Sequence, residues 1–341
     1  MTKRIGVLGA GAIGSSVGAD LTEAGEDVVL IDQWPAHVEA MRTEGLRVVM
    51  PGTEVNEKVR ALHIGELATE RPTFDVVLLA AKSYDTVWLC HLIKPYLADE
   101  GVFVGLQNGM NEEMITPIVG SERTIACVVE LSAEIWEPGL VQRDTTREGT
   151  WFAVGEIHGA ISDRVEEVAA LLRHSARVDV TDNIFGAKWS KLVVNSMTMG
   201  PYSLLGLKNW KASALPGMTE ISVRLGRESV AVGEGLGYRL EPIFGMSTEQ
   251  FSGSGDEMLV NAIRVLHGHI GKDATTATVQ DQRKGRRTEI DHITGTVVRK
   301  GREVGVPTPA NDAVMQLAAE IGRGGRAMEP ANLDALKTLL D

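Results

Sequence analysis

Three glycines near the start of the chain have the spacing of a turn that binds a pyrophosphate, in the stretch Gly9-Ala10-Gly11-Ala12-Ile13-Gly14. Gly9 permits a tight turn, and Gly11 leaves no side chain between the backbone and the phosphates. Gly14 lets the following helix pack close to the preceding strand, so that the N–H groups and dipole of that helix face the phosphates. We predict that a dinucleotide binds to Gly9, Gly11, Ala12, Ile13 and Gly14. The alternative is a glycine-rich turn without a ligand.

An acidic residue follows the second predicted strand, 27–31, and indicates which dinucleotide is bound. Asp32 lies 18 residues after Gly14, where a dinucleotide-binding fold has the acid that holds the adenosine ribose. Its carboxylate can accept hydrogen bonds from both ribose hydroxyls of NAD, whereas it would repel the additional phosphate of NADP. No arginine directly follows to offset that repulsion. We therefore predict NAD as the cofactor in preference to NADP.

A lysine and an asparagine in the stretch 188–195 could carry out proton transfer. Lys191 and Asn195 are four residues apart and so share one face of a helix, while the residues between them are apolar. Burial in such a helix lowers the proton affinity of a lysine, which suits proton exchange with a substrate near neutral pH. Asn195 could hold the amine or a substrate oxygen. The alternative is a lysine that reaches solvent and an asparagine that caps a nearby group.

The stretch 285–295 holds two acids and a histidine that allow several interpretations. Thr288 could cap a helix that has Glu289 and Asp291 in its first turn, a structural explanation for both acids. Glu289 with His292 could also hold a metal, as could His267 with His269. Neither pair has the further ligands that a closed site needs, so we expect no metal.

The elements that would position these residues alternate between strand and helix in the first half of the chain. Strands are expected at 3–8, 27–31, 46–50, 55–62, 74–81 and 102–106, and helices after the glycines, at 35–44 and at 84–97. This alternation is typical of an α/β fold with a Rossmann-type, doubly wound parallel sheet, in which ligands bind beyond the carboxyl ends of the strands. Lys82 and Asn108 directly follow two of these strands and are candidates for that reason.

The pattern changes twice further along the chain. Strand-like runs at 125–129, 139–142 and 150–154 predict antiparallel strands that close one edge of the sheet, followed by a helix at 165–174 and a short strand at 178–180. After Asp182 almost every apolar pattern has the helical period. We predict a dinucleotide-binding domain over 1–183 and a mainly helical domain for substrate binding and dimerisation over 184–341. Its helices are expected at 184–199, 215–235, 257–266, 288–304, 310–321 and from 330 onward.

The composition is that of an ordinary globular protein. A formal net charge of −12 over 341 residues argues against non-specific binding to nucleic acid or to anionic membranes. No apolar run approaches the about 18 residues that a membrane span needs. The two cysteines, Cys90 and Cys127, indicate no disulfide framework, which fits a cytoplasmic protein.

Four stretches in a fixed order span most of the chain: the glycine turn 9–14, Leu-Gln-Asn-Gly at 106–109, the helix 188–195, and Gln280-Asp281 followed by Thr-Glu-Ile-Asp at 288–291. In these stretches, and in the later segment 305–311, the chain resembles the ketopantoate reductase (2-dehydropantoate 2-reductase) family.

The resemblance implies a role for each candidate. Lys191 would be the general acid that protonates the carbonyl oxygen as hydride arrives, or the base in the reverse direction. Glu289 would hold the substrate hydroxyl or the lysine, and Asn195 would form hydrogen bonds in the same place. Asn108 and Lys82 would line the nicotinamide end of the cofactor. The resemblance also implies a homodimer that acts on a small-molecule substrate.

Three positions depart from the family pattern. The family usually has a second asparagine where this chain has Met199, and a serine where it has Ala277 between two threonines. Many members also carry a neutral or basic residue in place of Asp32. These departures predict an oxidoreductase that acts on a hydroxy or oxo acid other than ketopantoate. One alternative is a ketopantoate reductase that uses NADPH and whose substrate site has diverged. The other is a nucleotide-sensing protein without turnover. The joint presence of Lys191, Asn195 and Glu289 argues against this last alternative.

Overall fold

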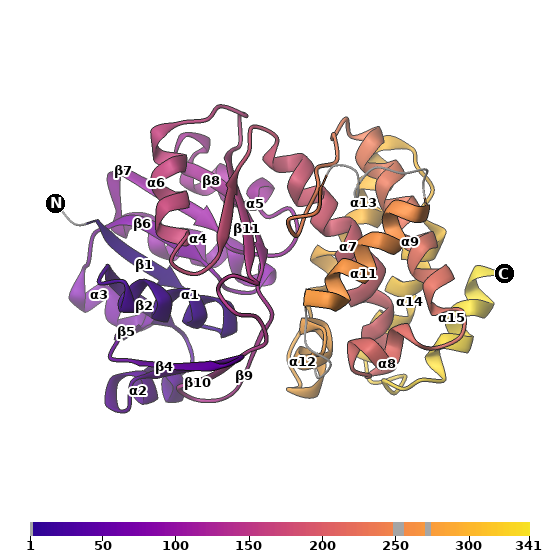
Figure 1. The fold of residues 1–341 in the computed structure, drawn as a ribbon, viewed down its shortest axis with the longest axis horizontal. Coiled ribbons are helices and arrows are strands. Elements are labelled where there is room, and N and C mark those ends of the chain that lie inside the picture. The colour runs from indigo at the N-terminus through magenta and orange to yellow at the C-terminus, as the bar shows by residue number, and fades with distance from the viewer. Residues whose placement is uncertain (1–2, 248–255, 270–273) are drawn as a thin grey trace. The chain divides into compact units, whose positions relative to one another are not determined.

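The computed structural model describes residues 3–247, 256–269 and 274–341. The chain divides into two compact units, Met1–Ile184 and Phe185–Asp341. The first combines strands and helices, and the second is helical in its described part (Figure 1). None of the described helices is long and apolar enough to cross a membrane. The α/β fold class expected from the sequence is confirmed.

The N-terminal unit is built on an eight-stranded sheet with the order β12-β11-β8-β7-β6-β1-β2-β5. Its strands are β1 (Arg4–Leu8), β2 (Asp27–Asp32), β5 (Arg60–His63), β6 (Phe74–Leu79), β7 (Leu97–Gly105), β8 (Thr124–Glu130), β11 (Trp151–Glu156) and β12 (Arg177–Val180). The first strand pairs in parallel with β2 on one side and with β6 on the other. The chain thus leaves β1 in one direction and later returns to its other side, which creates a switch point beyond the carboxyl ends of these strands.

Helices cover both faces of this sheet, which explains its continuous apolar strands. Along β6, Val76 and Leu78 belong to one core with residues of α1 (Ala12–Glu23) and α6 (Asp163–Leu172). Val77 and Leu79 point to the other face and join a core with residues of α4 (Thr86–Ile93) and α5 (Glu112–Val119). The remaining helices of this unit are α2 (Pro35–Thr43) and α3 (Leu67–Glu70), with short 3₁₀ turns at Ile64–Glu66, Ser83–Asp85, Lys94–Tyr96 and Ser121–Arg123.

Three expectations for the strands are wrong in whole or in part. The single strand expected over 55–62 is two strands: β4 (Thr53–Glu57) pairs with β3 (Leu46–Met50), whereas β5 joins the main sheet beside β2. The run at 139–142 is β10 (Leu140–Arg143), which lies with β9 (Ala133–Glu137) in a second sheet of order β4-β3-β10-β9. The run at 125–129, β8, is antiparallel to β11 as expected, but it pairs in parallel with β7 on its other side. Local patterns identified the strands but not their non-local partners.

The C-terminal unit is organised around one long, buried helix, α7 (Ile184–Leu205). Helix α9 (Met218–Gly235) packs closely on it, because a Cβ added at Gly233 would lie 2.3 Å from Trp189 Nε1 and one at Gly226 would lie 2.6 Å from Met197 Sδ. Helices α8 (Asn209–Ser213) and α12 (Ala277–Arg283) were not expected from the sequence. The other helices are α11 (Asp256–His269), the 3₁₀ turn Ile290–His292, α13 (Thr294–Val304), α14 (Pro309–Gly322) and α15 (Asn332–Leu340).

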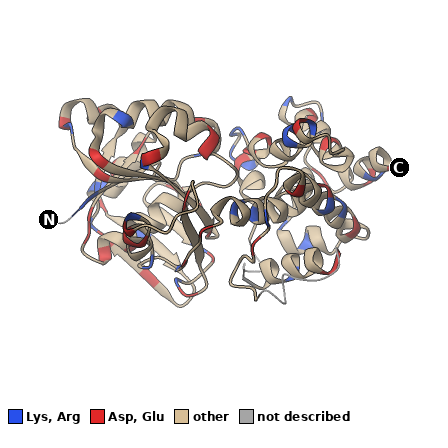
Figure 2. Ribbon diagram, turned by 90° about the horizontal axis from the view of Figure 1, so that it is seen from above, with Lys and Arg blue, Asp and Glu red and all other residues tan. Residues whose placement is uncertain are grey.

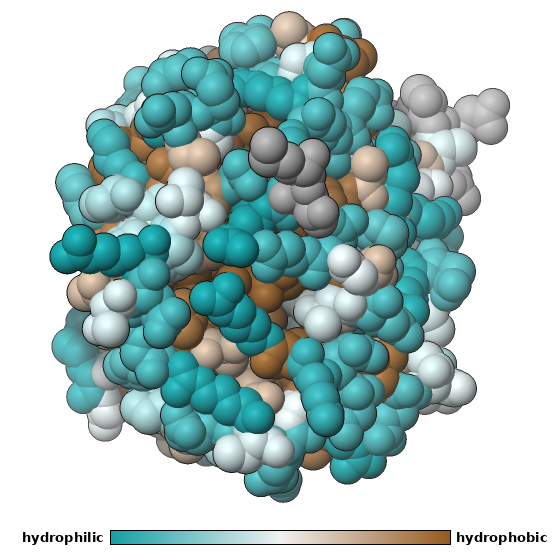
Figure 3. Space-filling model, turned by 90° about the vertical axis from the view of Figure 1, so that its left-hand side faces the viewer, coloured by the Kyte–Doolittle hydropathy of each residue, from teal (hydrophilic) through white to brown (hydrophobic). Residues whose placement is uncertain are grey.

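Charged residues of both signs are interspersed over the two units (Figure 2). The face of the N-terminal unit in Figure 3 is mostly hydrophilic, with separate apolar areas between the polar side chains. This unit exposes four large apolar residues in three separate segments of the chain: Val87 with Trp88, Trp136 and Ile161.

Candidate active site

The loop Gly9–Gly14, which we call the glycine loop, has glycine at three positions for different structural reasons. Gly9 has φ +91°, and a Cβ there would lie 2.7 Å from the backbone nitrogen of Ala81. A Cβ at Gly14 would lie 2.1 Å from the carbonyl oxygen of Gly9. By contrast, a Cβ at Gly11 would meet no described atom within 4 Å. Packing of the chain therefore requires glycine at two positions, while Gly11 keeps a space beside the backbone open.

The helix that follows the glycine loop presents its N-terminus at this open space. Helix α1 begins at Ala12, and its N-cap residue Gly11 supplies no side-chain cap. The N–H groups of the first turn, which includes Ile13, have no partner within a helix and are suited to an anion. Backbone donors at an uncovered glycine form a cradle that a Cβ would fill, so these residues fit the pyrophosphate of a dinucleotide.

Asp32 ends β2 and has a fixed orientation. Its Oδ1 accepts a hydrogen bond from the backbone N–H of Trp34 at 2.8 Å. The side chain is half-buried. The neighbouring turn is tied to the glycine loop, because the Gly9 N–H donates to the carbonyl oxygen of Ile31 at 2.8 Å. A carboxylate held in this way is suited to accept hydrogen bonds from a ribose.

Lys82 and Asn108 follow adjacent strands, and hydrogen bonds join the two turns in which they lie. Ser83 Oγ donates to the Asn108 carbonyl oxygen at 3.3 Å, and Gln107 Nε2 donates to the Ala81 carbonyl oxygen at 2.7 Å. Ala81 also packs against Gly9. The carboxyl ends of β7, β6, β1 and β2 thus bring Asn108, Lys82, the glycine loop and Asp32 to the same edge of the sheet.

In the C-terminal unit, Lys191 and Asn195 lie one turn apart on α7 and are 8% and 3% exposed. Lys191 Nζ lies over the ring of Phe244, 4.8 Å from its centroid. Burial lowers the pKa of Lys191 from 10.5 to about 7. The alternative of a lysine that reaches solvent is therefore wrong, and both the charged and the neutral amine are accessible near neutral pH.

Glu289 is also buried in this unit, with 5% of its surface exposed. It precedes the 3₁₀ turn Ile290–His292 and makes no side-chain cap, and the helix expected from Thr288 begins instead at Thr294. The explanation of Thr288 as a helix cap, with Glu289 in the first turn of that helix, is therefore wrong. Thr294 packs against α7, since a Cβ at Gly200 would lie 2.8 Å from Thr294 Oγ1.

The metal alternative finds no support in the described part of the chain. No group of three or more His, Cys, Asp or Glu side chains that could hold a metal occurs there. The side chain of His269, one of the residues considered, lies outside the described residues.

Two of the three positions at which the chain departs from the expected pattern lie on helices of this unit. Met199 is buried on α7, one turn beyond Asn195. Ala277 is the first residue of α12, which Thr276 caps by accepting a hydrogen bond from the Val279 N–H at 3.3 Å. The hydroxyls of Thr275 and Thr278 are buried without a hydrogen-bond partner in the described chain. The sequence indicated Thr278 only as a neighbour of Ala277, and no pattern pointed to Thr275.

Two further residues adjoin the candidates and were missed. Phe244 lies under the Lys191 amine, in a segment that carried no motif, with an unusual φ of +59°. His37 lies on α2 and contacts the carbonyl oxygen of Ala10 inside the glycine loop. No periodicity or spacing relates either residue to its partner.

Comparison with known proteins gives concordant matches over both units. A family model described as "Ketopantoate reductase PanE/ApbA" matches residues 5–156, and one described as "Ketopantoate reductase PanE/ApbA C terminal" matches residues 183–322. A 2-dehydropantoate 2-reductase of Mesorhizobium japonicum is 30% identical, over 93% of this chain and 97% of that protein.

Two solved structures have similar folds. A PanE/ApbA family ketopantoate reductase from Ralstonia eutropha JMP134 has a TM-score of 0.79 at 27% identity, covering 94% of this chain and 99% of that one. A D-mandelate dehydrogenase, solved with NADH and anilino(oxo)acetate, has a TM-score of 0.83 at 22% identity and the same coverage; at that identity the likeness concerns the fold alone.

Proposed function

Because the chain belongs to the ketopantoate reductase family, and is thus an NAD(P)-dependent oxidoreductase acting on CH–OH groups, we propose a finer function for it. It interconverts the alcohol and ketone of a small polar hydroxy or oxo acid other than ketopantoate, with NAD as cofactor. The observation that carries this proposal is Lys191, an amine buried on α7 whose pKa is lowered to about 7.

The proposed chemistry needs one proton for each hydride. The bound dinucleotide supplies or accepts the hydride at the substrate carbon. In the reductive direction the Lys191 ammonium donates a proton to the carbonyl oxygen, and the neutral amine remains. In the oxidative direction the neutral amine takes the proton of the alcohol. A pKa near the working pH allows both transfers.

The other candidates have supporting roles in this proposal. Asn195, one turn from Lys191, orients the amine or the substrate oxygen. Glu289, buried beside the start of α13, holds the amine or a substrate hydroxyl. Lys82 and Asn108 line the nicotinamide end of the cofactor, at the strand ends next to the glycine loop.

Asp32 supports NAD over NADP. Its carboxylate is already fixed by the Trp34 N–H, so it cannot turn away from a phosphate without loss of that hydrogen bond. Two like charges a few ångströms apart repel by about 1–4 kcal/mol in a surface cleft, or roughly ten- to a thousandfold in affinity. NAD use also favours, weakly, the oxidative direction.

Met199 and Ala277 support a substrate other than ketopantoate. Both lack the polar group that the family usually has there, and a site without such a partner leaves a substrate hydroxyl unpaired. The second candidate is ketopantoate reduction with NADPH, favoured by the 2-dehydropantoate 2-reductase relatives. The proposal further includes a homodimer, which rests on the family resemblance, and a cytoplasmic location, which rests on the two free cysteines.

The test is a panel of hydroxy and oxo acids, ketopantoate included, assayed with NAD(H) and NADP(H) in one buffer. We expect a small hydroxy or oxo acid with NAD to give the highest kcat/KM. A kcat/KM for ketopantoate of about 10⁵ M⁻¹s⁻¹ or more, within the usual enzyme range, would support the second candidate instead.

A further inference from the structure

His37 is fully buried at the start of α2, and both of its ring nitrogens form hydrogen bonds. Nδ1 accepts the backbone N–H of Gly139 at 2.9 Å. Nε2 lies 2.9 Å from the Ala10 carbonyl oxygen and 3.2 Å from Ser15 Oγ. The imidazole thus joins the glycine loop to the turn between β9 and β10.

These contacts define the tautomer of the ring. A backbone N–H can only donate, so Nδ1 is the acceptor, and the ring proton lies on Nε2, which donates to the Ala10 carbonyl. Burial lowers the pKa of His37, in keeping with a neutral ring. Stacking on Trp34, at 5.5 Å between ring centroids, limits rotation of the imidazole.

The Ala10 carbonyl receives a second hydrogen bond, from Ser15 Oγ at 2.7 Å. This carbonyl and the N–H of Gly11 belong to one planar trans peptide and point in opposite directions. Two donors that hold the carbonyl inward therefore turn the Gly11 N–H outward. Gly11 is the position beside which the described chain leaves open space.

We propose that His37 is a positioning residue for dinucleotide binding: it fixes the Ala10–Gly11 peptide so that the Gly11 N–H faces the pyrophosphate. The inference rests on the proposed nucleotide site. His37 acts through the backbone and through no contact with the reacting atoms.

The far side of the ring is also anchored. Gly139 donates its N–H to His37, and its carbonyl oxygen accepts the Arg47 N–H at 2.9 Å. A Cβ at Gly139 would lie 3.0 Å from Ala40 Cβ on α2, so the turn packs tightly on the helix that carries His37. The second sheet therefore supports the orientation of the glycine loop through His37, although none of its strands belongs to that loop.

Two variants distinguish the role of His37 Nδ1 from that of Nε2. In His37→Asn the amide oxygen can replace Nδ1 as the acceptor from Gly139, but no donor reaches Ala10. In His37→Gln the amide nitrogen can replace Nε2 as the donor to Ala10, but the acceptor for Gly139 is lost. Each loses one buried hydrogen bond, so we expect similar decreases in Tm.

Dissociation constants for NAD and NADP, measured by calorimetry, then test the inference. Loss of the donor should raise both constants about tenfold in His37→Asn, whereas His37→Gln should remain within about threefold of the parent. Equal constants in the two variants at equal Tm would overturn the proposal, because a purely structural role would not distinguish them.

Ser15→Ala provides a second test should either His37 variant fail to fold. It removes the other donor to the same carbonyl, and we expect weaker binding of both dinucleotides; unchanged binding would overturn the proposal. A parent protein that prefers NADP would contradict the proposed cofactor but not this inference. The loss of the His37 donor should raise the dissociation constants of NAD and NADP by the same factor.

Discussion

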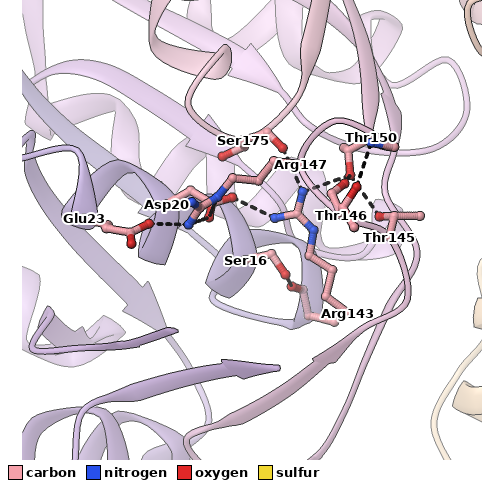
Figure 4. Close-up of polar contacts among 11 residues, drawn as sticks. Ser16, Asp20, Glu23, Arg143, Thr145, Thr146, Arg147, Thr150 and Ser175 are labelled. Carbon is pink, nitrogen blue, oxygen red and sulfur yellow. Dashed lines mark hydrogen bonds and ion pairs between the residues drawn. The ribbon is translucent and has the colours of Figure 1, made fainter. Parts of the chain in front are cut away.

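Arg143 and Asp20 form a buried ion pair, with 2.7 Å between Arg143 Nη1 and Asp20 Oδ2 and with side chains that are 0% and 2% exposed. Figure 4 shows how other groups complete the pair. Arg143 Nη2 donates to Thr150 Oγ1 and to the Ser175 carbonyl oxygen, and Arg147 contacts the second carboxylate oxygen of Asp20. The cluster ties the end of β10 to the last turn of α1, the helix that begins at the glycine loop.

Removal of one partner should therefore strongly destabilise the N-terminal unit. Asp20→Ala leaves the Arg143 charge buried, which costs about 3–5 kcal/mol in the free energy of unfolding, measured in urea. The double variant Asp20→Leu with Arg143→Met removes both charges and should be less destabilised than Asp20→Ala. The exposed pair Arg227–Asp256 is the control, and Asp256→Asn should leave stability close to that of the parent. Equal losses in Asp20→Ala and Asp256→Asn would contradict this explanation.

Lys191→Met should separate activity from stability. Loss of the proton donor and acceptor should lower turnover by about 10²-fold or more, with dinucleotide binding retained. Burial favours the neutral amine, so keeping a lysine here costs stability below pH 10.5, and most at and below about pH 7. Met has no charge to desolvate, and the variant should unfold at a higher urea concentration at pH 7. Lys211→Met, at an exposed lysine, is the control for both measurements. Near-normal turnover would remove Lys191 from the mechanism.

The lowered pKa of Lys191 also predicts opposite pH dependences for the two directions. Reduction needs the ammonium, so its kcat/KM should fall as the pH rises through about 7. Oxidation needs the neutral amine, so its kcat/KM should rise through the same range and level off above it. The measurement is a pair of initial-rate profiles with a substrate that works in both directions. Profiles that run in parallel would exclude a single group acting as acid and base.

Asp32→Asn should weaken the discrimination between the two cofactors. The amide oxygen can still accept the Trp34 N–H, so the turn is kept while the negative charge is lost. We expect the NAD-to-NADP ratio of kcat/KM to fall by roughly ten- to a thousandfold, the size of the repulsion removed. A parent protein that prefers NADP, or an unchanged ratio in the variant, would refute the role of the carboxylate.

Phe244→Leu should shift the pH profile of the enzyme. The phenyl face attracts the Lys191 ammonium and so favours its charged form, by about 0.5–2 kcal/mol in a desolvated setting. Leucine keeps an apolar side chain there without that attraction, so the apparent pKa should move down by about 0.4–1.5 units. Phe244→Tyr keeps the aromatic face and should keep the parent profile. An unchanged profile in Phe244→Leu would show that the ring acts only by filling space.

The sequence was sufficient for the parts of the fold that depend on local patterns. The glycine spacing and the continuous apolar run before Lys82 predicted β1, α1 and β6, because both signals lie within the elements they describe. The run at 55–62 failed because its two halves pair with different strands, β3 and β2. The local sequence of these residues does not determine which strand each half pairs with.

The same distinction holds for the candidate site. Lys82 and Asn108 could be selected because a parallel sheet collects the carboxyl ends of its strands at one edge. The apolar helix around Lys191 made its burial one of two interpretations, and the structure decides between them. Phe244 and His37 could not be found, since each meets its partner only after the chain has folded back, 53 residues from Lys191 in one case and 27 from Ala10 in the other.

The parallel pairing of β3 with β10, in which Leu140 lies opposite Arg47, sets the order in which the N-terminal unit can be completed. A nascent chain that ends at Glu130 already contains the glycine loop, α2 and Asp32, but not Gly139. In such a chain, β3 lacks its second neighbour and His37 Nδ1 lacks its donor. Closing so long a stretch of chain is slow compared with forming a helix. The nucleotide site should therefore reach its final form only after β10 has been synthesised, so this unit folds as a whole rather than from its first strands onward.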